Sequence, residues 1–369
     1  MARRLAVDLL WVRHKQVGGI EAYICNLLDG LMSLDEDFEL FLLVSRDNRE
    51  VFEHYAQDER YHIVECNLES RRVAQRILWQ NFQLGKIIKK LGLDVCFEPY
   101  YCKPFLGVHK IKFITTIHDL QALHYPQYFS KFKVLWMKKS WKNAVKTSKK
   151  IVAISKYVKN DIIENYKIDS EKVQVIYNPI LIKNNELESA EVIEQKYGVK
   201  RERFYFTVSS LLPHKNITTL IKVFSKIKTA NIALPCKLII SGIGGKSKEE
   251  LVLQIEREGL QSNIILTSFI DNAERNALYK YCKAFLFPSV FEGFGMPPIE
   301  AMYFGVPVIT TRKACLEEVT QGKANYVNDP FDVDEWIDIM KECKAGQCDL
   351  SIYDKTKIAE QYLKLFKDN

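Results

Sequence analysis

The sequence has no paired cysteines, no long hydrophobic run and no cluster of metal-binding side chains. Its nine cysteines are scattered singly, and neither a C-x-x-C pair nor a histidine group stands at zinc spacing. Such an odd, unpaired set is typical of reduced thiols in a cytoplasmic protein and argues against a secreted disulfide scaffold. No segment approaches the roughly 18 apolar residues that a membrane-spanning helix requires. These absences predict a cytoplasmic protein that is soluble or lies on a membrane surface.

The beginning of the sequence is similar to a signal peptide only briefly. Its apolar run is interrupted by Asp8 and ends at Arg13 and His14, so we expect a buried strand there. With 369 residues, of which 47% are hydrophobic, the chain is large enough for two domains with separate cores.

Positive charge is concentrated in one part of the chain. The formal net charge is +7, and residues 99–160 contain thirteen lysines but a single acid, Asp119. A helix within this part mixes basic and aromatic residues, and the candidates for a surface that binds anionic lipid are Lys133, Trp136, Lys138, Lys139 and Trp141. Each lysine near such a surface contributes about 1 kcal/mol. The alternative is a solvated helix in which Phe129, Phe132, Trp136 and Val145 form one stripe against the protein's own sheet. No nucleic-acid-binding motif accompanies the charge, so we expect no nucleic-acid partner.

Strand-like and helix-like segments alternate along the whole chain, which predicts an α/β protein with two Rossmann-like units. The first series of strands covers residues 5–12, 38–44, 61–65, 95–98, 112–117, 150–154 and 173–177. The second covers residues 204–209, 236–241, 264–268, 284–287 and 306–310. Helices are expected at residues 20–33, 71–91, 156–165, 217–228, 248–258, 272–280, 298–304 and 352–367. The first series ends at Asn178-Pro179.

Residues 287–309 contain the most informative pattern. Glu292 and Glu300 flank the segment Gly293-Phe294-Gly295-Met296, and two prolines follow that suit the first turn of a helix. The backbone amides of residues 294–296 would then face an anion such as a phosphate. Carboxylates accept hydrogen bonds from hydroxyls, so the two glutamates can hold two sugar rings at the ends of a diphosphate. The pattern predicts a nucleotide-sugar site.

Two further features lie at the ends of predicted strands. Gly18 and Gly19 follow the first strand, where glycine lets a backbone approach a ligand closely or simply forms a tight turn. His118 follows the strand at residues 112–117, at the edge of a parallel sheet where ligands bind. An imidazole there can hydrogen-bond a sugar hydroxyl or assist proton movement, although a lone histidine is more often structural.

The segment 287–309 resembles the E-x7-E signature of retaining GT-B glycosyltransferases, in particular glycosyltransferase family 4. The Pro-Ser, Glu-Gly-Phe-Gly, Pro-x-x-Glu-Ala and Gly-x-Pro-Val steps all occur in the family's order. The resemblance covers nearly the whole chain. It implies a GT-B fold, in which two Rossmann-like domains with parallel sheets face each other across a deep cleft. Residues 1–180 would form the acceptor-side domain, residues 181–350 the nucleotide-sugar-binding domain, and residues 351–369 a helix that returns to the first domain.

The resemblance also implies roles for individual residues. Glu292 would bind the donor sugar, Glu300 the ribose, and His118 would lie beside the anomeric centre. Gly18 and Gly19 would lie beside the diphosphate. The backbone of residues 268–270, including Ile270, would contact the nucleobase.

Residues 209–216 are similar to the family's element that neutralises the diphosphate with an arginine and a lysine. Lys215 stands in the lysine position, but Ser210 stands in the arginine position and carries no charge. His214 or an arginine from elsewhere would have to meet the second charge. Family members that resemble mannosyltransferases share this serine with a Lys-Asn pair, which favours GDP-mannose over a UDP-sugar.

The resemblance thus implies a metal-independent, retaining hexosyltransferase of bacterial-type polysaccharide or glycolipid assembly. The nucleoside-diphosphate sugar would be a substrate, so no cofactor is expected, and the acceptor would be a glycan or a lipid-linked glycan. Such an enzyme would be cytoplasmic and peripheral on the inner leaflet of the plasma membrane. The alternatives are another GT-B enzyme, such as a sugar phosphorylase or a nucleotide-sugar epimerase, or a non-catalytic surface-binding protein with this fold.

Overall fold

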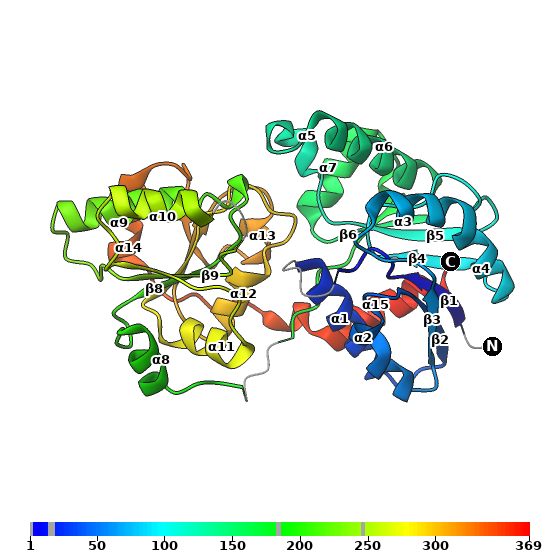
Figure 1. The fold of residues 1–369 in the computed structure, drawn as a ribbon, viewed down its shortest axis with the longest axis horizontal. Helices are drawn as coiled ribbons and strands as arrows, with labels where there is room; N and C mark the ends of the chain where they lie inside the picture. Colours follow the sequence, from blue (N-terminus) through cyan, green and yellow to red (C-terminus); the bar gives the residue numbers. More distant parts are fainter. Residues whose placement is uncertain (1–2, 14–18, 182–185, 245–247) are drawn as a thin grey trace. The chain divides into compact units, whose positions relative to one another are not determined.

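The computed structural model describes residues 3–13, 19–181, 186–244 and 248–369. The chain divides into two compact units (Figure 1). Unit 1 comprises Met1–Leu181 together with Ser351–Asn369, and unit 2 comprises Ile182–Leu350. Each unit contains one parallel sheet whose two faces are covered by helices. Among the helices of the described residues, none combines the length and apolarity needed to cross a membrane.

The sheet of unit 1 has seven strands in the order β3-β2-β1-β4-β5-β6-β7. These strands are β1 (Arg3–Asp8), β2 (Phe38–Ser45), β3 (Tyr61–Cys66), β4 (Val95–Glu98), β5 (Lys112–Ile117), β6 (Lys150–Ala153) and β7 (Val173–Val175). All neighbouring pairs are parallel. The strand order reverses between β1 and β4, and ligands of such sheets bind where the carboxyl ends of the strands diverge.

One face of this sheet packs against α1 (Gly19–Met32) and α15 (Lys355–Lys367), which lie side by side (Figure 1). A Cβ atom on Gly30 of α1 would come within 2.4 Å of the Lys355 carbonyl oxygen, so only glycine permits this close contact. The other face packs against α3 (Val73–Trp79) and α4 (Gly85–Lys90). The remaining helical segments are α2 (Arg49–Phe52), η1 (Glu53–Gln57), η2 (Gln80–Leu84), α5 (Gln121–His124), η3 (Pro126–Tyr128), α6 (Lys131–Thr147), α7 (Lys156–Tyr166) and η4 (Ser170–Lys172).

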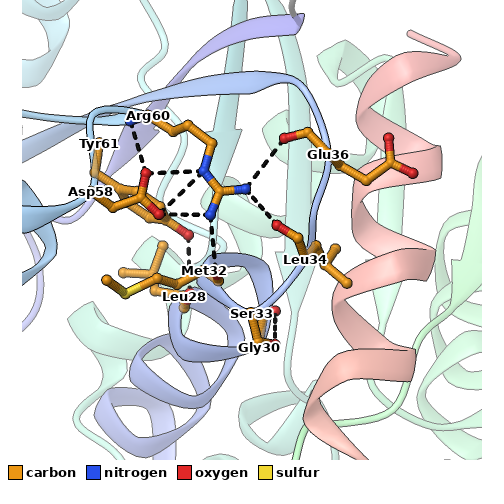
Figure 2. Close-up of polar contacts among 9 residues, drawn as sticks. All are labelled: Leu28, Gly30, Met32, Ser33, Leu34, Glu36, Asp58, Arg60 and Tyr61. Atoms are coloured by element: carbon orange, nitrogen blue, oxygen red, sulfur yellow. Dashed lines mark hydrogen bonds and ion pairs between the residues drawn. The ribbon is translucent and has the colours of Figure 1, made fainter.

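The carboxyl end of α1 is held by Arg60 (Figure 2). The guanidinium donates to the carbonyl oxygens of Met32 at 2.8 Å and Leu34 at 2.5 Å, and to the Asp58 carboxylate at 2.6 Å. The last carbonyls of a helix have no partner within the helix, so a cation at this position both satisfies them and complements the helix dipole. Arg60 therefore anchors the helix that begins at Gly19.

The sheet of unit 2 has six parallel strands in the order β10-β9-β8-β11-β12-β13. They are β8 (Tyr205–Val208), β9 (Leu238–Ser241), β10 (Ile264–Leu266), β11 (Ala284–Phe287), β12 (Val308–Thr311) and β13 (Asn325–Val327). The helical segments are α8 (Ala190–Tyr197), η5 (Pro213–Lys215), α9 (Ile217–Thr229), α10 (Lys248–Arg257), α11 (Asn272–Tyr281), α12 (Met296–Tyr303), α13 (Leu316–Val319), α14 (Val333–Glu342) and, at the boundary with unit 1, η6 (Leu350–Tyr353). The strand order reverses between β8 and β11.

The structure differs from the sequence prediction at the helix expected over residues 71–91. Two α-helices, α3 and α4, are separated there by the π-helical turn η2. The Asn81 side chain donates to the Ile77 carbonyl at 2.7 Å and accepts from the amide of Phe105 at 2.8 Å. This contact with a distant loop explains why the interruption is not visible in the local pattern.

Candidate functional site

The candidate site of unit 2 is built around the turn between β11 and α12. Gly295 has φ of +86°, and a Cβ atom there would lie 2.9 Å from Leu316 Cδ2, so glycine is required. Met296 begins α12, and prolines follow in its first turn. The amides of residues 294–296 therefore lie at the mouth of a helix, where an anion is favoured.

Lys215 and Glu292 meet beside this turn. Lys215 lies in η5 after β8, Glu292 follows β11, and these two strands are neighbours in the sheet. Lys215 Nζ lies 2.6 Å from Glu292 Oε1, and the side chains are only 19% and 12% exposed. The Ser289 hydroxyl donates to the same carboxylate oxygen. The structure thus brings together the lysine and the first glutamate that the sequence singled out.

Glu300 is held from the neighbouring helix α11. The buried Tyr279 donates a hydrogen bond from its hydroxyl to Glu300 Oε2 at 2.9 Å, and Arg275 Nε lies 3.9 Å from the same oxygen. Tyr279 and Arg275 lie in the segment expected to be helical, but nothing in its local pattern indicated that they contact Glu300.

Cys315 supports the turn from behind. Its buried thiol lies 3.2 Å from the carbonyl oxygen of Glu292 and 3.1 Å from that of Phe294, and it donates toward both. Together with Leu316, which packs on Gly295, it fixes the backbone between the glutamates. A single cysteine with no sequence motif around it provided no signal for this role.

His214 was one candidate for the second charge expected near the diphosphate. This residue is buried, and burial lowers its pKa to about 4, so the imidazole is neutral near pH 7. Ser210, in the position of the family's arginine, is partly buried at the end of β8. Ile270 is 8% exposed and packs in the core, whereas the neighbouring Phe269 is 76% exposed.

In unit 1, His118 lies at the carboxyl end of β5. Its Nε2 atom lies 2.9 Å from the carbonyl oxygen of Pro99, and the Tyr23 ring of α1 packs edge-on at 5.0 Å between ring centroids. Burial lowers the pKa of His118 to about 4, so the ring is neutral. Because a carbonyl oxygen can only accept, Nε2 carries the hydrogen and Nδ1 is the acceptor nitrogen. Gly19 begins α1 and is exposed, while Gly18 lies outside the described residues.

The basic aromatic helix is α6, and its exposed residues differ in part from the prediction. Lys133, Lys138 and Lys139 are exposed, and Trp136 is partly buried against Phe105, with the ring centroids 5.6 Å apart. Trp141, expected on the surface, is fully buried, and its ring lies 5.4 Å from that of Tyr101 between centroids. The stripe expected from Phe129 to Val145 is also wrong, since Phe132 is 89% exposed and Val145 is buried.

Two segments of the sequence, residues 35–37 and 332–334, have the D-x-D form of metal-dependent transferases. Asp332 caps the amino end of α14 through the amides of Asp334 and Glu335. Throughout the described ranges, no group of three or more histidine, cysteine, aspartate or glutamate side chains is placed to hold a metal ion.

Comparison with known proteins identifies the family. Residues 189–355 match the model of Glycosyl transferases group 1, and residues 17–182 match the model of Glycosyltransferase Family 4. The O-antigen chain mannosyltransferase RfbU of Salmonella typhimurium is 31% identical over 229 residues, which are 61% of this chain and 59% of RfbU. O-antigen chain mannosyltransferase B of Escherichia coli is 28% identical over 239 residues, which are 64% of this chain and 62% of that protein. The match therefore spans about three fifths of the length of each relative.

Solved structures agree on the fold. The crystal structure of Anabaena Alr3699/HepE in complex with UDP-glucose superimposes with a TM-score of 0.76 at 18% identity, covering 99% of this chain and 100% of that one. With two parallel-sheet units and two family models that follow each other along the sequence, the chain belongs to glycosyltransferase family 4 and has the GT-B fold.

Proposed function

We propose that this glycosyltransferase retains the α configuration while it moves a hexose from a nucleoside-diphosphate sugar to an acceptor hydroxyl. The donor that we favour is GDP-mannose, with a UDP-sugar as the second candidate, and the product belongs to a bacterial-type polysaccharide or glycolipid. The observation that carries the proposal is the contact between Lys215 and Glu292 beside the mouth of α12.

This contact presents a cation and an anion side by side in a partly buried place. A donor needs both, because its diphosphate is anionic and its sugar hydroxyls are hydrogen-bond donors. On donor binding, Lys215 turns toward the diphosphate, while Glu292 accepts from the sugar and keeps its bond from Ser289. Glu300, held by Tyr279, accepts from the ribose.

The chemistry requires stabilisation of the leaving diphosphate. The bond between the anomeric carbon and the phosphate oxygen breaks, positive charge develops on the sugar, and negative charge develops on the phosphate. Lys215 and the amides at α12 supply the compensating charge and dipoles, so the proposed transfer is metal-independent. A phosphate oxygen takes the proton from the acceptor hydroxyl as the new bond forms on the same face.

A neutral His118 suits this scheme. A charged imidazolium beside the anomeric centre would oppose the positive charge that develops there, whereas the neutral ring adds no such repulsion. Its Nδ1 atom can accept a hydrogen bond from a sugar hydroxyl. His118 therefore acts by orienting the sugar, and no protein base is needed.

The relatives support the choice of donor and acceptor. Two of them are O-antigen mannosyltransferases, and the solved neighbour contains UDP-glucose. We therefore propose that the acceptor is a glycan or a lipid-linked glycan, and that the enzyme works in the cytoplasm at the inner leaflet of the plasma membrane. The nucleotide sugar is the substrate, and no cofactor takes part.

The surface of α6 is the proposed contact with an anionic membrane. Its exposed lysines surround two exposed apolar side chains, Phe132 (89% exposed) and Leu135 (53% exposed). Leu106, which follows the Phe105 that contacts Trp136 of α6, is 51% exposed. Apolar side chains within a basic face are typical of helices that lie in a lipid interface.

The experiment that tests the function is a donor panel. Purified protein is incubated with GDP-mannose, UDP-glucose and related donors, with and without a polyprenyl-diphosphate-linked glycan acceptor, and products are identified by NMR. Acceptor-dependent formation of an α-linked product supports the proposal. A β-linked product contradicts retention, an altered sugar nucleotide indicates an epimerase, and a sugar phosphate formed only with inorganic phosphate indicates a phosphorylase. No product and no donor binding would indicate a non-catalytic protein.

A further inference from the structure

Two carboxyl groups meet in the core of unit 1, outside the residues already assigned. Strands β1 and β4 pair in parallel, with Ala6 opposite Cys96 and Val7 opposite Phe97. The next pair in this register is Asp8 and Glu98, the last residues of the two strands. Both are 0% exposed. They therefore point to the same face of the sheet, which α3 and η2 cover.

The hydrogen bonds of the two groups are unequal. Asp8 accepts from the Leu10 amide at 3.0 Å and from Gln80 Nε2 at 2.7 Å. Glu98 receives no hydrogen bond at either oxygen from a donor among the described residues, and the strand register places the Asp8 carboxyl beside it. Two ionised carboxylates can only accept and would repel each other, so a bond between them requires a proton.

We propose that Asp8 and Glu98 share one proton, carried by Glu98 and donated to Asp8, and that this acid pair positions His118. Asp8 accepts two hydrogen bonds, which stabilise its negative charge, whereas Glu98 accepts none from another donor. The proton therefore resides on Glu98. The effect on the position of His118 is transmitted through the adjacent backbone. Pro99, next to Glu98, provides the carbonyl that accepts from His118 Nε2. The Asp8 carbonyl also accepts from Trp11 Nε1 at 2.9 Å, so the pair joins the two loops that follow β1 and β4.

The surroundings agree with a neutral Glu98. Burial and the neighbouring Asp8 raise its pKa well above the ordinary value. The other titratable or charged groups that face the pair are Arg76 of α3, Lys103 after β4, and the thiols of Cys66, Cys96 and Cys102. Arg76 and Lys103 favour the ionised form of Glu98 and so lower its pKa, but the effect of burial on this pKa is larger.

The first test measures thermal unfolding of the full chain against pH for the wild type and Glu98→Gln. The folded pair keeps a proton that the unfolded chain releases, so the contribution of the pair to wild-type stability should fall as pH rises above about 5. Glutamine keeps the donor and cannot titrate. The Tm of Glu98→Gln minus that of the wild type should therefore grow by roughly 2–4 °C per pH unit until Glu98 ionises. The exposed Glu171→Gln is the matched control, with no such trend expected.

A second variant distinguishes a pair that shares one proton from a pair in which both carboxyl groups are ionised. Asp8→Asn has one acceptor oxygen, so either Leu10 or Gln80 loses its partner and the Tm should fall. With both groups ionised, Asp8→Asn would instead supply a donor to Glu98 and raise the Tm. A raised Tm, or a difference between Glu98→Gln and the wild type that does not change with pH, overturns the shared proton.

The positioning role rests on the proposed function and has its own readout. Glu98→Leu removes the bond while it largely fills the space, and it should lower kcat at least tenfold with little change in the KM of the donor. Glu98→Gln should restore kcat to within about threefold of the wild type. Equal kcat in both variants would overturn the positioning. If the wild type transfers no sugar, the proposed function fails, whereas the unfolding test still decides whether the proton is shared.

Discussion

Lys215 and Glu292 follow two neighbouring strands, β8 and β11, and Lys215 Nζ lies 2.6 Å from Glu292 Oε1. Each side chain therefore holds the other in a partly buried position. In the proposed function, the diphosphate sugar enters between them and separates the pair.

Replacing Lys215 with alanine should lower kcat/KM at least tenfold, because the leaving diphosphate loses its side-chain cation. Transfer is measured with purified protein whose fold is checked by circular dichroism. Lys222→Ala, an exposed lysine of α9, is the control and should retain activity. Unchanged transfer in Lys215→Ala would remove this lysine from the mechanism.

Tyr279→Phe should weaken donor binding through Glu300. The variant deletes the hydroxyl that donates to Glu300 at 2.9 Å and keeps the ring in the core. A hydrogen bond to a charged group is worth about 1.5–3 kcal/mol, so the KM of the donor should rise roughly tenfold or more, with a smaller change in kcat. The exposed Tyr303→Phe is the control. Equal KM values in both variants would show that Glu300 needs no such support.

Acid should destabilise the protein through its buried histidines. Burial lowers the pKa of both His118 and His214 to about 4, below the ordinary value of 6.5. The two histidines contribute fully to the free energy of unfolding above pH 6.5, and this contribution is lost as pH falls toward 4. The reason is that the histidines of the unfolded chain bind protons that the buried histidines exclude. Each histidine contributes a slope of up to about 1.4 kcal/mol per pH unit in this window. Unfolding by urea at several pH values measures it, and His118→Asn should show a smaller slope than the wild type.

Arg60→Ala should destabilise unit 1. The substitution removes the charged donor from the carbonyls of Met32 and Leu34 and leaves the Asp58 carboxylate without its cation, at a cost of about 2–4 kcal/mol. Arg60→Lys should recover only part of the lost stability, because an ammonium group cannot reproduce the planar set of N–H donors of a guanidinium. Arg72→Ala removes an exposed ion pair with Glu69 and should change the free energy of unfolding by less than about 1 kcal/mol. Urea denaturation compares the three variants.

Phe132→Ser combined with Leu135→Ser should weaken sedimentation with vesicles that contain anionic phosphatidylglycerol. Both side chains are exposed on α6, so their loss leaves the core intact. Leu253→Ser, an exposed leucine of α10 in unit 2, is the control. Binding that is equal in all proteins would contradict a membrane contact through α6.

Much of the fold and part of the site followed from the sequence alone. The strands at residues 95–98, 112–117 and 284–287 agree with β4, β5 and β11, because short apolar runs between turn residues indicate buried strands. The glycines and prolines around Glu292 also indicated a helix mouth, since glycine permits the positive φ found at Gly295 and proline fixes φ at a value that suits the first turn of a helix.

Tertiary structure alone decided which side chains meet. Glu300 with Tyr279, Cys315 with the Glu292 carbonyl, and Asp8 with Glu98 each join segments that are distant in the sequence or carry no motif. The same holds for Trp141. The helical pattern allowed this side chain to lie on the surface or in the core, and only the tertiary structure shows that it is buried. Local pattern determines secondary structure and strained backbone positions, whereas burial and long-range register determine which groups lose water, and thus their charge and partners.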